Sequence, residues 1–292
     1  MLETIVALVC RILSNPVANA LQKQLVQKKS AILINWYSYL FLSLFCLLVS
    51  INSSSNIQIV KEFLTYGLDF WFYVALAGIL CTLGSICLIK ALQIGDMSVL
   101  GPINSYKSIV GLVFGVILLG EIPSITGLAG VLLIVAGSWF IFDTVDEGFS
   151  FKLFLRKDII LRFCALFFTG CEAAVLKKII LMSSVWESFI LWCFSGFIFT
   201  LLIFLVFNVK IQLLTKKELI KCFFIALCLG VMQFSTNFVF EKMNVGLALA
   251  LFQLSTLVSV ILGYKIFQEQ QILKKVLGSI IMIAGTCLIL LF

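Results

Sequence analysis

The sequence predicts an all-α integral membrane protein with ten transmembrane helices, arranged as an inverted repeat of two five-helix halves. Three observations carry this prediction. First, 62% of the 292 residues are hydrophobic and only 12% are charged, whereas soluble proteins are about half apolar and about a quarter charged. Second, apolar runs long enough to cross a bilayer recur along the whole chain. Third, the second half of the chain repeats features of the first half.

The predicted transmembrane helices are apolar runs of about 20 residues, the length that spans the hydrocarbon core of a bilayer. No segment between them is long enough to form a soluble domain. The connection at 52–69 includes a Ser-rich stretch, and the charged connection at 143–158 joins the two halves. The predicted spans are 2–22, 31–51, 70–90, 97–118, 124–142, 159–180, 186–207, 219–241, 246–267 and 272–291.

The internal repeat appears when the chain is aligned with itself at offsets of 148 to 154 residues. Each match is weak alone, but the matches keep their order along the chain. Five helices per copy is an odd number, so the second copy must enter the membrane from the opposite side. The predicted halves are residues 1–145 and 146–292. Matching pairs include Lys23 with Lys177, Trp36 with Trp186, Glu121 with Glu269, and Gly130 with Gly278.

The last two helices of each half meet at a glutamate-containing corner, which reads LLGEIPSITGLAGVLLIVAG at 118–137 and IFQEQQILKKVLGSIIMIAG at 266–285. With these corners, the twofold repeat and a polar first helix (SNPVANALQK, 14–23), the chain resembles the drug/metabolite transporter superfamily, in particular its ten-helix EamA-like branch. Gln268 departs from the pattern, because a Gly is expected there. The resemblance implies a central cavity lined by helices 1–4 and 6–9, with helices 5 and 10 at the periphery, and transport of small polar or amphipathic metabolites.

Positive residues are distributed unequally between the two sides of the predicted membrane. Of the 21 Lys and Arg residues, 4 lie in loops on the side of the termini and 15 on the other side, Arg162 among them, while Arg11 and Lys107 lie within helices. Because Lys and Arg favour the cytoplasmic side, this distribution predicts a multi-pass protein of the cell inner membrane with both termini outside. The family resemblance implies the reverse orientation, with the termini in the cytoplasm.

Polar side chains within spans are costly in lipid and indicate a cavity or a polar partner. Arg11, Asn15 and Asn19 follow one another at four-residue intervals on one face of the first helix, and Gln233 and Asn237 share a face of the eighth. One interpretation is a substrate-binding lining, in which the Arg11 guanidinium holds a carboxylate or phosphate. The other is a structural stripe in which Arg11 pairs permanently with a buried acid.

Four further substrate-binding candidates lie in other spans. Glu172 is the one acid deep in a predicted span, and it is either a proton-coupling carboxylate or the partner of a fixed ion pair with Arg11 or Lys107. Lys107 is either a ligand for an anionic group or a snorkelling or paired amine. Asn104 in the fourth helix and Gln253 in the ninth complete the set.

These features predict a secondary-active transporter of anionic or zwitterionic solutes, such as amino acids, that works by alternating access around a central cavity. The chain has no His, which excludes His-based triads and His-ligated zinc, and it lacks the GxxxxGK[ST] phosphate-binding motif. We therefore expect no enzyme activity, no catalytic or metal-ligating residues and no cofactor. The alternative function is a flippase of a lipid-linked sugar or related amphipathic lipid, which would need a polar groove open to the bilayer.

The expected partners are a small-molecule substrate and the lipid bilayer, and no nucleic acid. A proton is one option for the coupling ion, and the protein is expected as a monomer or a homodimer. The corner residues Glu121 and Glu269 are expected to cap helices or to bond local loops rather than to react.

Overall fold

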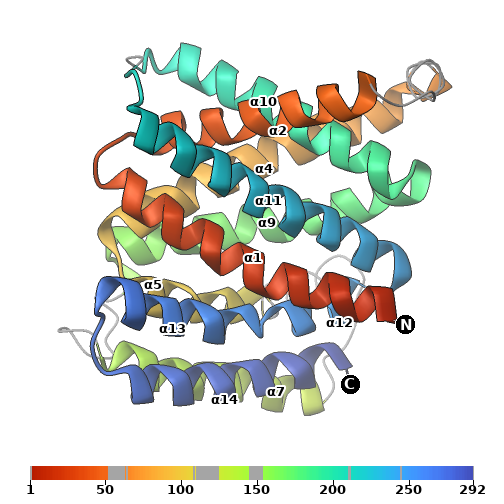
Figure 1. The fold of residues 1–292 in the computed structure, drawn as a ribbon. Coiled ribbons are helices and arrows are strands. Elements are labelled where there is room, and N and C mark those ends of the chain that lie inside the picture. Colours follow the sequence, from red (N-terminus) through yellow and green to blue (C-terminus); the bar gives the residue numbers. More distant parts are fainter. Residues whose placement is uncertain are drawn as a thin grey trace.

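All the regular structure in the described part of the chain is helical. The computed structural model describes residues 2–51, 63, 65–107, 109, 125–144, 154–209, 212–243 and 245–291. The helices stack in rows, and both chain ends lie at the same end of the bundle (Figure 1). Within the described ranges, seven helices are long and apolar enough to cross a membrane. They are α1 (Leu2–Val26), α2 (Ala31–Ile51), α4 (Leu68–Ile94), α7 (Ile125–Phe142), α9 (Lys157–Met182), α10 (Val185–Val206) and α11 (Lys216–Lys242).

Shorter helices complete the described part. The segment after α4 forms α5 (Met97–Leu100) and the 3₁₀ helix η1 (Pro102–Ser105), and the segment after α11 forms α12 (Val245–Phe252) and α13 (Ser255–Phe267). The helix α14 (Ile272–Leu291) ends the chain. Each predicted span thus has helical residues within the described ranges, and helix ends differ from the predicted ones by up to four residues, except where a span is interrupted.

The segments predicted as the spans 97–118 and 246–267 are each interrupted in the described residues. In the first segment, α5 stops at Leu100 and Pro102 opens η1, because proline has no backbone N–H to continue the helical ladder. In the second segment, a turn at Gln253 and Leu254 separates α12 from α13. Residues 110–118 lie outside the described residues.

Local sequence signals explain where two of the long helices start. Thr215 and Glu218 form a reciprocal capping box at the start of α11, in which each side chain bonds the other residue's backbone N–H. The Ser184 side chain accepts a hydrogen bond from the backbone N–H of Glu187 at the start of α10. These caps pair backbone donors that would otherwise lack partners at the ends of apolar helices.

The packing of the long helices follows a symmetrical pattern. The helix α1 packs against α11, α4 packs against α9, α2 against α10, and α7 against α14. The backbones of α7 and α14 approach closely, because a Cβ atom added to Gly278 would lie 2.6 Å from the carbonyl oxygen of Gly137. The pairs α1–α11 and α4–α9 stand in the middle of the bundle (Figure 1). Residues of all four helices line one polar cavity.

Candidate substrate cavity

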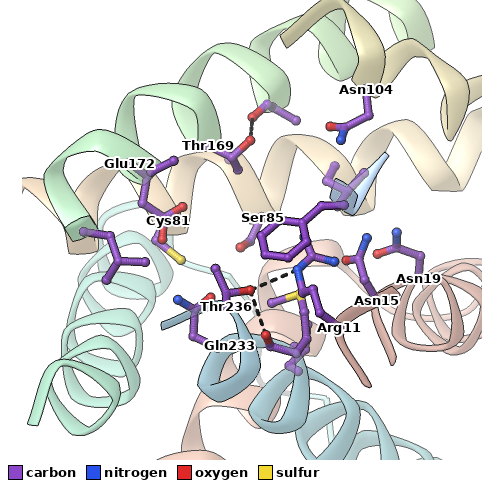
Figure 2. Close-up of a pocket in the computed structure, with 18 of the residues that line it drawn as sticks. Arg11, Asn15, Asn19, Cys81, Ser85, Asn104, Thr169, Glu172, Gln233 and Thr236 are labelled. Carbon is purple, nitrogen blue, oxygen red and sulfur yellow. Dashed lines mark hydrogen bonds between the residues drawn. The ribbon is translucent and has the colours of Figure 1, made fainter. Parts of the chain in front are cut away.

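A cavity of about 150 Å³ lies between the central helices. Its walls come from α1, α2, α4, η1, α9, α10, α11 and α12, and from Lys107, which follows η1. Pockets for drug-sized ligands occupy about 300–1,000 Å³, so this one suits a small solute. In Figure 2, Glu172 and Cys81 lie on one side of the cavity and Arg11, Asn15 and Asn19 on the other.

The Arg11 guanidinium from α1 lies on one wall of this cavity. Its Nε donates to Thr236 Oγ1 at 3.0 Å (Figure 2), and its Cζ lies 4.7 Å from the centre of the Phe252 ring, within the range of a cation–π contact. Its Nη1 is buried without a hydrogen-bond partner among the described residues. No ion pair within 4.0 Å joins Arg11 to an acid that the structure describes, so the described residues do not support the interpretation of a permanent pairing.

Arg162 from α9 is a second cation in the lining, although the sequence prediction counted it among loop residues. Its side chain donates through Nε to the Leu100 carbonyl oxygen at 2.8 Å and through Nη2 to Asn104 Oδ1 at 3.0 Å. Asn104 in turn donates to Gln253 Oε1 at 3.2 Å. Arg162 thus bridges α9 to the interruption between α5 and η1, and only 8% of the residue is exposed.

Lys107 contributes a third positive charge. It lines the cavity together with Glu172, Arg162 and Arg11 and is close enough to interact electrostatically with each. Its side chain also passes next to Gly170 of α9, where a Cβ atom would lie 3.6 Å from Lys107 Cγ. No hydrogen bond or ion pair joins the Lys107 ammonium to any described residue. The structure therefore places this ammonium in the lining with no carboxylate bound to it.

Glu172 is the acid of the lining. Its Oε1 accepts a hydrogen bond from the indole Nε1 of Trp192 at 3.0 Å, and the Cys81 side chain lies next to it (Figure 2). The Cys81 sulfur lies 2.9 Å from the Tyr39 hydroxyl. No ion pair within 4.0 Å joins Glu172 to Arg11 or Lys107 among the described residues, so the interpretation of a fixed ion pair is wrong for this structure. The carboxylate is held by an uncharged donor instead.

Seven of the nine predicted substrate-binding residues line this one cavity: Arg11, Asn15, Asn19, Asn104, Lys107, Glu172 and Gln233. The other two do not line it. Asn237 is fully buried, and its amide lies within hydrogen-bonding distance of Gln233 and of Ser188 on α10. Gln253 is 1% exposed and bonds Asn104. Asn237 is covered by the packing of α11 against α10, and Gln253 lies in the turn after α12, so neither side chain reaches the cavity. Each instead bonds a residue of the lining, Gln233 and Asn104 respectively.

Several lining residues were not predicted as ligands. Cys81 and Ser85 lie one turn apart on α4, and Arg162, Thr169 and Glu172 share one face of α9. The sequence contained a signal for the α9 set, since Arg162 precedes Glu172 by ten residues and Thr169 precedes it by three, which is helical spacing. Proximity to the charged connection before α9 obscured that signal.

A second polar network lies at the end of the bundle opposite the chain termini. Glu269 accepts hydrogen bonds from Lys23 Nζ at 2.9 Å and from the backbone N–H groups of Met97 and Ser98 at 2.9 and 2.8 Å. Burial raises the pKa of Glu269, but the hydrogen bonds from Ser98 and the attraction of Lys23 outweigh it and lower the pKa overall. Glu269 thus caps α5, as expected of a local cap, whereas Glu121 lies outside the described residues.

The comparison with protein families decides what kind of protein holds this cavity. The sequence pattern of the EamA-like transporter family matches residues 5–143 and 156–291. The chain belongs to the EamA-like transporter family. The family pattern thus occurs twice along this EamA-like chain, in agreement with the drug/metabolite transporter superfamily. Membership indicates a multi-pass membrane transporter of small molecules rather than an enzyme.

Two further comparisons concern the EamA-like chain as a whole. No curated protein matches its sequence. Among solved structures, one titled "Crystal structure of protein" matches with a TM-score of 0.68 over 98% of this chain and 94% of its own, at 11% sequence identity. At this identity the likeness shows a shared fold, and the function must be argued from the site.

Proposed function

We propose that the protein is a secondary-active transporter of small anionic or zwitterionic metabolites, for example amino acids, and that it works by alternating access around the central cavity. The observation that carries the proposal is the lining itself. Arg11, Lys107 and Arg162 face a cavity of small-solute size together with the carboxylate of Glu172. Charged groups within membrane-spanning helices mark substrate and ion pathways.

The helix pairing supports ten membrane crossings in two repeats of opposite orientation, residues 1–145 and 146–292. In such a repeat, α1 corresponds to α9 and α4 corresponds to α11. The contact of α1 with α11 then corresponds to the contact of α9 with α4, and both contacts are present. The pairs α2–α10 and α7–α14 correspond to themselves, as helices next to a twofold axis must.

The two interrupted helices also support a transporter. The interruption between α5 and η1 and the one between α12 and α13 occupy matching places in the two halves. Their residues Asn104 and Gln253 bond each other across the repeat interface. Many secondary transporters bind their substrate where discontinuous helices of two inverted repeats meet.

Glu172 is the group we assign to proton coupling. A carboxylate takes this role because the chain has no His. Its hydrogen-bond donor Trp192 is uncharged, so protonation removes a charge that no described cation neutralises through an ion pair. The orientation we propose has both termini outside the inner membrane. Moving Arg162 from the loops to the cavity leaves a large excess of Lys and Arg on the opposite side.

The flippase alternative is less well supported. A second pocket, of about 430 Å³, lies between α2, α10 and α11, but its lining is aromatic and aliphatic except for Ser235. A flippase would need polar groups there to carry a headgroup across the bilayer. One chain supplies every wall of the cavity. The proposed function is therefore compatible with either a monomer or a homodimer.

The deciding experiment is solute exchange in proteoliposomes containing the purified protein and a panel of labelled metabolites. We expect exchange of at least one small anion or zwitterion, and we expect Arg11→Ala and Lys107→Ala each to weaken it at least about tenfold, since a charged hydrogen bond is worth about 1.5–3 kcal/mol. The matched control is Lys90→Ala, because Lys90 is exposed near the end of α4. Parental exchange in both cavity variants would contradict the site, and transbilayer movement of a labelled lipid without solute exchange would favour the flippase.

A further inference from the structure

We infer that the cavity is built for a solute with two negative charges, such as a small dicarboxylate or a phosphate monoester, and that Arg162 supplies the positive charge that makes the difference. This inference depends on the proposed function for its physiological meaning, because it names the substrate class of the same site. With Arg11 and Lys107 alone, the lining would be compatible with monoanionic, zwitterionic and dianionic solutes. The third cation, Arg162, favours the dianionic ones.

The position of Arg162 is fixed without its charge being neutralised. Its two hydrogen-bond acceptors are the Leu100 carbonyl oxygen and the Asn104 side-chain oxygen, and both are uncharged. The nearest acid in sequence, Asp158 one turn earlier, bonds Arg156 at 2.9 and 3.1 Å instead. The third guanidinium nitrogen, Nη1, has no protein partner among the described residues. Arg162 is therefore a positioned guanidinium with its charge still available.

The other two cations of the lining, Arg11 and Lys107, also have no described acid paired with them. Arg11 bonds the Thr236 hydroxyl and stacks on Phe252, and its Nη1 is buried without a partner in the described chain. Lys107 bonds no described residue. Against these three positive charges the described lining holds a single carboxylate, Glu172, so two positive charges are left in excess.

A transporter passes through a state in which the solute is sealed from water on both sides, and charges in that state are expensive unless they are paired. A dianion neutralises the two excess positive charges, whereas a zwitterion leaves both and a monoanion leaves one. Guanidinium groups also match the planar carboxylate and the phosphate by two parallel hydrogen bonds. The charge balance therefore favours a dianion over an amino acid of similar size.

The first test measures binding without transport. The detergent-purified protein is heated with succinate, glycerol 3-phosphate, lactate or alanine, and the shift in its unfolding temperature is recorded. We expect succinate or glycerol 3-phosphate to stabilise the protein at concentrations at least about tenfold lower than lactate or alanine. The reason is that lactate leaves one positive charge of the lining unpaired and alanine leaves two. Stabilisation by alanine or lactate at the lower concentration would overturn the inference.

The second test repeats the comparison with Arg162→Gln, which keeps hydrogen-bonding groups at this position but removes the charge. We expect the preference for the dianion over lactate to fall at least about tenfold and Arg162→Lys to restore part of it. Lys90→Gln, on an exposed position of α4, is the matched control. If Arg162→Gln folds and keeps the parental preference, the role of Arg162 is wrong. If it does not fold, the preference of the parent protein still decides the substrate class.

Exchange of the same four solutes in proteoliposomes separates this inference from the proposed function. Dianion binding without any exchange would leave the inference standing and contradict the transporter. Exchange of alanine or lactate but not of the dianions would support the transporter and overturn the inference. Absence of both binding and exchange for all four solutes would contradict both.

Discussion

At the scale of single residues, uncharged side chains around the cavity orient the charged side chains that line it. Trp192 donates its indole N–H to Glu172 and Tyr39 contacts Cys81, so neutral groups orient the one acid of the described lining. Asn104 orients Arg162 in the same way. Because these partners are uncharged, the charges of the lining remain available to a solute or a proton.

Replacing Glu172 tests its role in coupling. In Glu172→Gln the amide oxygen still accepts the Trp192 hydrogen bond, but the side chain no longer takes up a proton. We expect the ratio of accumulation driven by a proton gradient to exchange without a gradient to fall at least about tenfold, the equivalent of 1.4 kcal/mol, whatever the change in solute affinity that loss of the carboxylate causes. The measurement is uptake into proteoliposomes with and without an imposed pH difference. Glu241→Gln, at an exposed position of α11, is the control, and unchanged gradient-driven uptake in Glu172→Gln would contradict the assignment.

At the scale of helices and loops, Glu269 joins three segments at one end of the bundle. Its carboxylate caps the N-terminus of α5 through Met97 and Ser98 and pairs with Lys23 of α1. Lys23 also donates to the Gly95 carbonyl oxygen at 2.9 Å, at the end of α4. This network closes the bundle just beyond Gln22, which lines the cavity.

The lowered pKa of Glu269 makes this network sensitive to acid. A carboxyl group whose pKa is lower in the folded protein stabilises the fold above its unfolded pKa of about 4.3, and that contribution disappears as the pH falls through the folded value. We expect Glu269→Gln to destabilise the protein by about 1–3 kcal/mol at neutral pH, because Lys23 loses its nearer charged partner and keeps only Asp96 at 3.9 Å. Thermal unfolding followed from pH 7 to pH 3 should show a smaller acid-induced loss in Glu269→Gln than in the parent. A loss of equal size would exclude Glu269 as its source.

At the scale of the whole molecule, α7 and α14 join the two halves through backbone contact. A Cβ atom on Gly278 would meet the Gly137 carbonyl oxygen at 2.6 Å, and one on Gly285 would meet the Gly130 carbonyl oxygen at 2.6 Å. Small residues allow such close approach between helices in a membrane, where apolar burial between helices adds little. These two helices contribute no wall to the cavity.

Adding one methyl group at this contact tests its importance. We expect Gly278→Ala to lower the stability by about 1–3 kcal/mol, because the backbones must move apart. Gly67→Ala is the matched control, since nothing lies within 4 Å of a Cβ atom there. Unfolding temperature and the yield of monodisperse protein are the measurements, and equal values for the two variants would show that the contact tolerates a methyl group.

The orientation of the whole molecule has its own test. Leu155 precedes α9 and is 74% exposed, so a cysteine there should report the side that carries most Lys and Arg. With the termini outside, Leu155→Cys resists an impermeant thiol reagent in intact cells and reacts after permeabilisation. Gly67→Cys, which precedes α4 on the side of the termini, should react in intact cells. The reverse pattern would place the termini in the cytoplasm.

Hydrophobicity predicted the helices well because the bilayer requires long apolar runs. Hydrophobicity alone does not mark the interruptions at Pro102 and Gln253, because the surrounding residues stay apolar, although Pro102 itself indicates a bend. Helical spacing brought Arg11, Asn15 and Asn19 to one wall, but it placed Asn237 on the cavity face when that side chain packs against Ser188. The sequence did not predict Arg162 as a residue of the lining, because it follows the charged connection at 143–158 closely and so resembles a loop residue. Side-chain contacts between helices depend on tertiary packing, which a single sequence does not specify.

The hydrogen bond between Trp192 and Glu172 gives the protein an intrinsic optical sensor. Indole emission responds to the charge and the hydrogen bonding of its neighbours, and one of the five tryptophans touches the acid of the cavity directly. We therefore expect occupancy of the cavity or protonation of that acid to alter the fluorescence of an unlabelled sample. Titration of the native chain with a ligand would show this change, and we expect the change to be lost in Trp192→Phe.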